Sequence, residues 1–358
     1  MQPENPHNEA ITLNPSTGDR TALLAGIAPW DHPGSNWNRA AMHPAPVDPF
    51  CARTEWQLSF HEAMAPHRPL IVREVPGSVV ALAEERHPGV GRIFMPVEAG
   101  WLFGCPLLGP DAVDLLEELL AEHEPAAGAR APVFVISGLA PEGELIRQLG
   151  RRLGPRFNSK HHVVATLCSA SLDGGLDGFL SRRSARHRQN LRKQLRRATR
   201  AGVSFERHAP ADAAEARQIY ARMLAVEEQS WKGIGECGMT VGRSRRYYDC
   251  MMRRLAASAS GRVIFARHAE RDIGYIFGGL AGRVYRGQQF SYADDWATYS
   301  IGNLLQLEQI RWLCEEHMAR YDMGPMMDYK RHWTEEQRVV ETWVFQRRLL
   351  LGSTGAGH

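Results

Sequence analysis

The sequence has no long apolar run and no paired cysteine motif. No apolar segment approaches the roughly 18–20 residues needed to cross a bilayer. The first residues carry no Lys or Arg before Arg20 and no apolar core, which argues against a secretion signal. The six Cys are scattered without a CxxC pair, so we expect free thiols rather than a disulfide framework. These absences predict a cytoplasmic protein with no membrane span.

Two kinds of chemistry also lack a signature. His161 and His162 are adjacent in an expected strand, so their side chains point to opposite faces and cannot share a metal ion. No Ser or Cys nucleophile motif is present. We therefore expect no metal, and any group transfer is expected to proceed by direct attack rather than through a covalent enzyme intermediate.

Acidic residues are missing from one basic stretch. The net charge is only +3, but residues 182–200 hold nine Arg or Lys and no Asp or Glu. Leu191 and Leu195 recur at helical spacing and Gly202 is a good terminator, so the stretch predicts a basic helix. It can be a solvated face, or a binding site for phosphates or another anionic partner. No aromatic residues are interleaved, so sequence-specific RNA recognition is not indicated.

The length of 358 residues suggests two domains of ordinary size. Residues 1–48 are rich in Pro, Asn, His and Gly and predict an irregular arm. We expect a first domain over 49–170, a second over 171–348, and a flexible tail over 349–358. Strands and helices alternate in both, which indicates a mixed α/β fold.

Hydrophobic periodicity gives the expected elements. Helices are predicted at residues 51–64, 111–122, 142–152, 182–200, 211–229 and 302–320. Strands are predicted at residues 70–75, 78–83, 92–97, 101–105, 133–137, 161–168, 203–206, 262–266, 273–278, 284–291, 321–323 and 338–346.

Three stretches carry a family resemblance. They are the basic helix that leads into a strand at 190–206, the segment Glu-Gln-Ser-Trp-Lys-Gly at 228–233, and the helix start at 299–305 with Asp-Tyr-Lys-Arg-His-Trp at 328–333. In this order they resemble the CelD-like and FemAB-like branch of the GNAT acyltransferase superfamily. The resemblance implies an α/β (α+β) fold of two GNAT-like mixed β-sheet domains in tandem, the first degenerate.

The resemblance also implies a thioester donor, acyl-CoA or acyl carrier protein, in the gap between splayed strands. Its phosphates would lie at a helix N-terminus, which offers unpaired N–H groups. The residues expected to hold the donor are Ser300, Ile301, Gly302, Asn303 and Lys330.

Acyl transfer to an amine needs a base, an oxyanion donor and an acid for the leaving thiolate. Glu228, beside Trp231 at a helix end, and His332 are candidate bases, and Tyr329 is the candidate acid. The acceptor is an amine on a small molecule, peptide or saccharide. Its expected contacts are Trp231, Gln289, Tyr292, Asp294 and Asp322.

The sequence thus predicts an N-acyltransferase that forms a ternary complex. Two alternatives stay open: a FemAB-type aminoacyltransferase that uses aminoacyl-tRNA, and a non-catalytic module on a GNAT fold that binds anions or RNA. The sequence predicts neither the acyl chain nor the oligomeric state.

Overall fold

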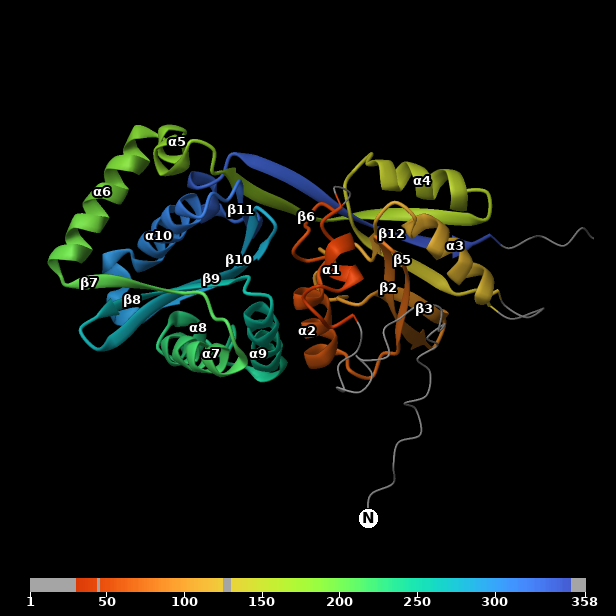
Figure 1. Ribbon diagram of the computed structural model, residues 1–358, viewed down its shortest axis with the longest axis horizontal. Helices are drawn as coiled ribbons and strands as arrows, with labels where there is room; N and C mark the ends of the chain where they lie inside the picture. The colour runs from red at the N-terminus through yellow and green to blue at the C-terminus, as the bar shows by residue number, and fades with distance from the viewer. Residues whose placement is uncertain (1–29, 44–45, 125–129, 349–358) are drawn as a thin grey trace, which may run out of the picture.

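The computed structural model describes residues 30–43, 46–124 and 130–348. Its centre is a 12-stranded mixed sheet in the order β1-β2-β3-β5-β12-β6-β11-β10-β9-β8-β7, with β4 beside β2 (Figure 1). The strands are β1 (Leu70–Val75), β2 (Ser78–His87), β3 (Gly91–Pro96), β4 (Leu107–Leu108), β5 (Val133–Leu139), β6 (Phe157–Ser171), β7 (Val203–His208), β8 (Gly261–His268), β9 (Arg271–Ala281), β10 (Val284–Tyr292), β11 (Arg320–Pro325) and β12 (Glu336–Arg347).

Helices cover the sheet. In the second half, α6 and α10 lie on one face and α7 to α9 on the other (Figure 1). The α-helices are α1 (Asn36–Ala40), α2 (Thr54–Met64), α3 (Ala112–Glu122), α4 (Glu144–Leu153), α5 (Gly175–Ser181), α6 (Ala185–Arg200), α7 (Ala213–Glu228), α8 (Trp231–Ile234), α9 (Gly242–Ala257) and α10 (Ile301–Glu315). Two 3₁₀ helices, η2 (Asp294–Tyr299) and η3 (Asp328–His332), flank α10 and β11 in sequence.

The two halves repeat one topology. In each, three antiparallel strands lead into a helix and then into a strand parallel to the third. The first copy is β1-β2-β3, α3, β5, and the second is β8-β9-β10, α10, β11. In both copies the parallel pairing is short, two residue pairs for β3–β5 and three for β10–β11. This shared order identifies a tandem repeat.

The last strand of each half pairs with the other half. Strand β6 follows the first repeat but bonds β11 of the second, and β12 follows the second repeat but bonds β5 of the first. The two exchanged strands also pair with each other from Glu336↔Ser169 to Arg347↔Phe157. The halves therefore share one continuous sheet.

One apolar core also crosses between the halves. Trp56 and Phe60 of α2 pack against Tyr247 of α9, and the Trp56 and Tyr247 ring centroids are 5.7 Å apart. Figure 1 shows α2 and α9 side by side below the exchanged strands. Burial of these large rings, at roughly 25 cal/mol per Å² of apolar area, strengthens the connection made by the sheet.

The structure confirms most predicted elements and corrects two. Residues 101–105 are not a strand, because backbone N–H groups of Gly100, Trp101, Leu102 and Phe103 turn around the buried Glu98 carboxylate instead of joining a ladder. Helix α9 was not predicted, and the helix predicted at 302–320 ends at Glu315.

Several sequence predictions concern regions that the structure describes only in part. Residues 1–29 of the expected arm and the expected tail at 349–358 lie outside the described residues. Within the described ranges, no helix is long and apolar enough to cross a membrane, and no group of three or more His, Cys, Asp or Glu is arranged to hold a metal ion.

Candidate active site

Strands β10 and β11 separate shortly after they meet. Their parallel pairing covers only Val284–Arg286 on β10 and Arg320–Asp322 on β11. Beyond this point β10 pairs with β9 alone, while β11 continues along β6. The fork therefore leaves one edge of β10 open between Gly287 and Tyr292.

A buried ion pair holds the base of the fork. The Arg286 guanidinium donates to Asp48 at 2.9 Å and to Asp322 at 3.3 Å, and all three residues are buried. Gly324 has a φ of +75°, and a Cβ there would lie 2.1 Å from Arg286 Nη1, so glycine is required for the guanidinium to fit. Burial raises the pKa of Asp322, although Arg286 opposes the effect. Asp322, predicted to contact the acceptor, instead lies in this structural ion pair.

The alternation of antiparallel bonds determines which groups face the open edge. Ala293 N donates to Ile273 O at 2.9 Å, so this residue pair is a bonded pair of the β9–β10 ladder. Phe290 and Tyr292 then fall at the non-bonded positions opposite β9. Their backbone N–H and C=O groups point away from β9 into the fork. The Phe290 carbonyl accepts there from Lys232 at 2.8 Å, and the other groups can pair with an extended ligand.

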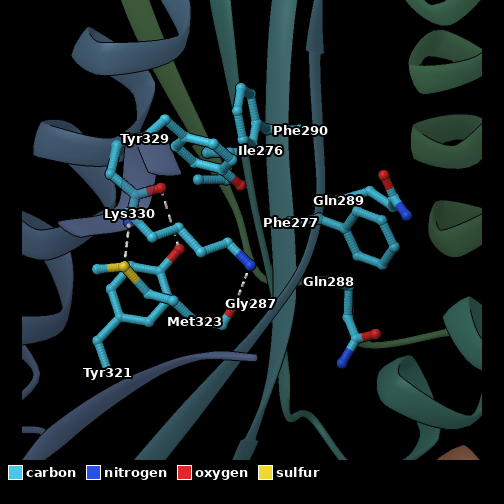
Figure 2. Close-up of a pocket in the computed structure, with 11 residues that line it drawn as sticks. Ile276, Phe277, Gly287, Gln288, Gln289, Phe290, Tyr321, Met323, Tyr329 and Lys330 are labelled. Atoms are coloured by element: carbon cyan, nitrogen blue, oxygen red, sulfur yellow. Dashed lines mark hydrogen bonds between the residues drawn. The ribbon is translucent and has the colours of Figure 1, made fainter. Parts of the chain in front are cut away.

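A small cavity lies in the fork. It encloses about 40 Å³, close to the volume of one water molecule. Figure 2 shows Tyr329 and Lys330 on one side of β10, and Gln288 and Gln289 on the other. The remaining lining residues are Ile276, Phe277, Gly287, Phe290, Gln306, Tyr321 and Met323. A cavity of this volume admits only a water-sized group, so a larger ligand requires the lining side chains to move.

Lys330 is a buried amine at the cavity wall. Its Nζ donates to Met323 O at 2.7 Å and to Pro325 O at 2.8 Å. No carboxylate of the described residues lies within 4.0 Å of it, and burial lowers the pKa of Lys330 to about 8. A neutral amine keeps two N–H donors, so both hydrogen bonds survive loss of the proton while the lone pair becomes free. Lys330, predicted to bind the donor, thus has the properties of a base.

A second hollow adjoins Lys330. Pro325, whose carbonyl accepts from Lys330, lines an open surface hollow together with Val164 and Thr166 of β6 and Arg331 of η3. The loop from Pro325 to Arg331 therefore separates this hollow from the cavity in the fork. Lys330 lines the cavity in the fork and bonds the Pro325 carbonyl, so it lies between the two spaces.

Lys232 reaches the same fork from the opposite face of the sheet. Its Nζ donates to Gln289 Oε1 and to Phe290 O, both at 2.8 Å. Burial lowers the pKa of Lys232, and within the described part of the chain no carboxylate forms an ion pair with it. Glu227, fully buried, accepts from Tyr275 Oη at 2.6 Å and from Met239 N at 3.1 Å, which holds the chain around Lys232 in place.

The start of α10 borders the cavity through Phe290. Ser300 has a φ of +58° and makes no side-chain capping bond, so the first N–H groups of the helix, at Ile301 and Gly302, are not capped by it. A Cβ on Gly302 would lie 2.9 Å from the Phe290 ring and 3.2 Å from that of Tyr292. Glycine thus lets α10 approach the open edge of β10. Asn303 Nδ2 donates to Gln194 of α6 at 3.4 Å.

The remaining predicted site residues lie away from the cavity lining. Glu228 is exposed at the end of α7, and its neighbour Glu227 is the buried carboxylate. Trp231 is 58% exposed. His332 is exposed, with its ring centroid 5.8 Å from that of His187.

Two more predicted acceptor contacts border the helix start. Asp294 donates its backbone N–H to Gln229 O at 3.0 Å, which ties η2 to the end of α7, while its side chain is exposed. Tyr292 packs against Gly302. Of the predicted site residues, the structure brings Gln289, Tyr329 and Lys330 together at the cavity and places Ser300, Gly302 and Tyr292 beside it.

Sequence reasoning missed Lys232 as a site residue, together with the ion pair of Arg286 and Asp48. Lys232 stands inside a segment that carries the family resemblance, which was the available signal. Its contacts to Gln289 and Phe290 cross 57 and 58 residues of sequence, so no local pattern indicates them.

A protein family matches the part of the chain that contains the fork. Residues 185–331 match the acetyltransferase (GNAT) domain family. No curated protein sequence matches the chain. The solved structure of FemX is similar with a TM-score of 0.60 at 12% identity, over 86% of this chain and 95% of FemX.

Two further solved structures are similar in overall fold. The C-terminal domain of a putative lysylphosphatidylglycerol synthetase from Agrobacterium fabrum gives a TM-score of 0.53 at 14% identity, over 86% of this chain and 90% of that one. The structure of L-PGS from Bacillus licheniformis gives 0.51 at 13% identity, over 79% and 84%. At these identities the likeness concerns the fold. Residues 185–331 thus match a GNAT acetyltransferase domain, and the chain over most of its length shares the fold of FemX and of the lysylphosphatidylglycerol synthetase domain.

Proposed function

We propose that the protein is an N-acyltransferase that moves an acyl group from a thioester, on CoA or an acyl carrier protein, to an amine. The observation that carries the proposal is the fork between β10 and β11, with the open edge at Phe290 and Tyr292 beside the uncapped start of α10. The open edge supplies N–H and C=O groups to amides of the donor arm, and the helix start suits its phosphates.

In the proposed reaction, the amine nitrogen attacks the thioester carbonyl carbon, a C–N bond forms and the C–S bond breaks. Lys330, as the neutral amine, accepts the proton that the acceptor nitrogen loses. The ammonium of Lys232 stabilises the negative charge that develops on the carbonyl oxygen. Tyr329 donates a hydrogen bond to the leaving sulfur. The acceptor, an amine on a small molecule, peptide or saccharide, approaches through the hollow beside Pro325 and Thr166.

Calorimetry with acetyl-CoA and a long-chain acyl-CoA, followed by a thiol-release assay with an amine panel, tests this function. We expect saturable donor binding that R147Q, a change on the outer surface of α4, leaves intact. We also expect K330M to lower kcat while donor binding persists. A folded wild type that binds neither CoA thioester, does not bind an acyl carrier protein, and releases no thiol contradicts the proposal.

A second candidate is an aminoacyltransferase that takes its donor from aminoacyl-tRNA. The fold likeness to FemX and the basic surface of α6 favour it. In the same calorimetry, strongly salt-dependent binding of tRNA without binding of any thioester would select this function. A non-catalytic module that binds anions or RNA would show the same binding and no transfer with any donor.

A further inference from the structure

The outer face of α6 carries positive charge without partners. Among the described residues, no carboxylate lies within 4.0 Å of five of its side chains, and all five are exposed: Arg186, Arg192, Lys193, Arg196 and Arg200. Helix α4 provides the contrast, because all three of its arginines pair with Glu or Asp: Arg147, Arg151 and Arg152. Both helices are rich in arginine. Helix α6 differs from α4 in that, among the described residues, these five cations have no carboxylate partner.

Three of the unpaired cations form a row. Arg186, Lys193 and Arg200 recur every seven residues, which is close to two helical turns, so they project from the same side of α6. At 1.5 Å per residue the row is about 21 Å long. Leu191 and Ala198 are buried on the opposite side, so the row faces outward. Figure 1 shows α6 at the outer edge of the second half.

Helix α6 packs against η2 and the first turn of α10, where the phosphates of the proposed donor would lie. Arg197 donates to Thr298 O at 3.0 Å and its guanidinium lies 4.6 Å from the centroid of the Tyr299 ring. Gln194 accepts from Asn303 in the first turn of α10. A macromolecule seated on the outward row would therefore lie next to the segment that leads into the fork.

We propose that the outward row of α6 is a docking surface for an acidic carrier protein that presents the acyl group on a phosphopantetheine arm. The inference rests on the proposed N-acyltransferase function and selects its donor. The row extends too far along α6 to be needed by the few phosphates of a single CoA at the start of α10. An acidic helix of a small carrier protein matches a single row of cations in length and in charge.

The surroundings favour an acidic protein over RNA. The segment from Ala185 to Arg200 has no Phe, Tyr or Trp on which bases could stack, and the rings of the neighbouring η2 are already in contact, Tyr299 with Arg197 and Trp296 with His268. Exposed carboxylates stand in the elements next to α6, Asp177 in α5 and Asp294 in η2. These negative charges disfavour a polyanion that extends beyond α6 onto the neighbouring elements.

The experiment compares one acyl group on two donors. We would measure kcat/KM with an acyl-loaded acyl carrier protein and with the matching acyl-CoA, for wild type, for R186Q/K193Q/R200Q, and for the α4 control R147Q/R151Q/R152Q. Each triple variant removes three positive charges. We expect the α6 variant to lose about 10-fold or more with the carrier protein at low salt, a loss that shrinks as salt rises. The same variant stays within about twofold of wild type with acyl-CoA, and the control stays near wild type with both donors.

Equal loss with both donors, or loss in the α4 control as well, would overturn the docking surface. Direct binding keeps the test independent of turnover: the fluorescence anisotropy of the labelled carrier protein should rise with wild type and with the α4 control, and not with the α6 variant. Carrier binding that the α6 variant retains overturns the inference, as does tRNA binding to the α6 row without carrier binding. Carrier binding by α6 without any transfer would support the surface and contradict the proposed function instead.

Discussion

The ammonium of Lys232 and the carbonyl of Phe290 lie 2.8 Å apart, although one belongs to α8 and the other to the open edge of β10. Lys232 is half-buried and forms no ion pair among the described residues, although the buried carboxylate of Glu227 favours its charged form. Such a cation is costly to desolvate, so an apolar side chain would serve a role in packing alone as well. Its position at an unpaired sheet edge suits a negative oxygen that forms during the reaction.

The variant K232M tests this role. We expect kcat to fall by about 10²–10³, the cost of removing one donor to an oxyanion, with donor affinity little changed. The thermal midpoint should change little, because loss of the hydrogen bonds to Gln289 and Phe290 is offset by removal of an ammonium that is costly to desolvate. K232R, which keeps the charge, should recover part of kcat. A fall in stability with unchanged kcat would show that Lys232 only supports the fold.

Lys330 gives a prediction for the pH dependence of turnover. Because burial lowers its pKa to about 8, the free amine becomes abundant as pH rises from 7 to 9, and kcat should rise over this range. K330M should be slow and should lose this rise. E228Q and H332Q test the two bases that the sequence suggested. Loss of the pH-dependent rise in either of them, with K330M retaining it, would move the base away from Lys330.

The same lysine predicts how stability changes with pH. Its pKa of about 8 in the folded protein lies below the ordinary value near 10.4 of an unfolded chain. Between these values the unfolded state binds more protons, so the free energy of unfolding increases with pH. Urea titrations should show wild type gaining up to about 3 kcal/mol relative to K330M between pH 8 and 10.5. If the free energies of unfolding of wild type and K330M change equally with pH, the lowered pKa assigned to Lys330 is contradicted.

Removal of the cation at the base of the fork should destabilise the protein. R286M leaves Asp48 and Asp322 buried without their partner, which costs roughly 3–5 kcal/mol in the free energy of unfolding. R147M, which removes a partner of the exposed Glu144, should stay within about 0.5 kcal/mol of wild type. Denaturant unfolding of both variants measures this difference. An equal loss in the free energy of unfolding would show that the buried ion pair stabilises the fold no more than the exposed one.

Gly302 tests the close approach of α10 to β10. G302A places a methyl group 2.9 Å from the Phe290 ring, so we expect a loss of about 1–3 kcal/mol in stability and weaker donor binding. On α4, G150A meets no atom within 4 Å and should stabilise by about 0.5–1 kcal/mol through helix propensity. Calorimetric melting separates the two outcomes, and stabilisation by both changes would exclude a tight contact at Gly302.

Local patterns predicted most of the fold, since strands such as β5 and helices such as α3 carry clear periodicity. Helix α9 was missed because charged residues dominate its sequence, although Tyr247, Met251 and Leu255 recur every four residues on its buried side. Residues 101–105 were predicted as a strand because they are mostly apolar. In the structure their backbone instead turns around the Glu98 carboxylate, and the sequence does not indicate these hydrogen bonds.

The site was predictable where a short segment carries it. Tyr329 and Lys330 were identified as neighbours in one motif, and both line the cavity. The role of Lys330 as a base was not predicted, because its lowered pKa results from burial in the folded protein. The fork depends on Asp48 and Arg286, which are 238 residues apart in sequence, and on Lys232 meeting β10, so long-range packing alone reveals them.

The exchange of β6 and β12 has a consequence for how substrates enter. Strands β6 and β12 form a long backbone ladder with each other. Strand β6 also pairs with β11 of the second half, and β12 with β5 of the first. Within the described residues the two halves are therefore joined by paired strands, and separating them would break several ladders at once. We expect access to the fork to need small local displacements of η3, whose Tyr329 and Lys330 line the cavity, rather than a movement of one half against the other.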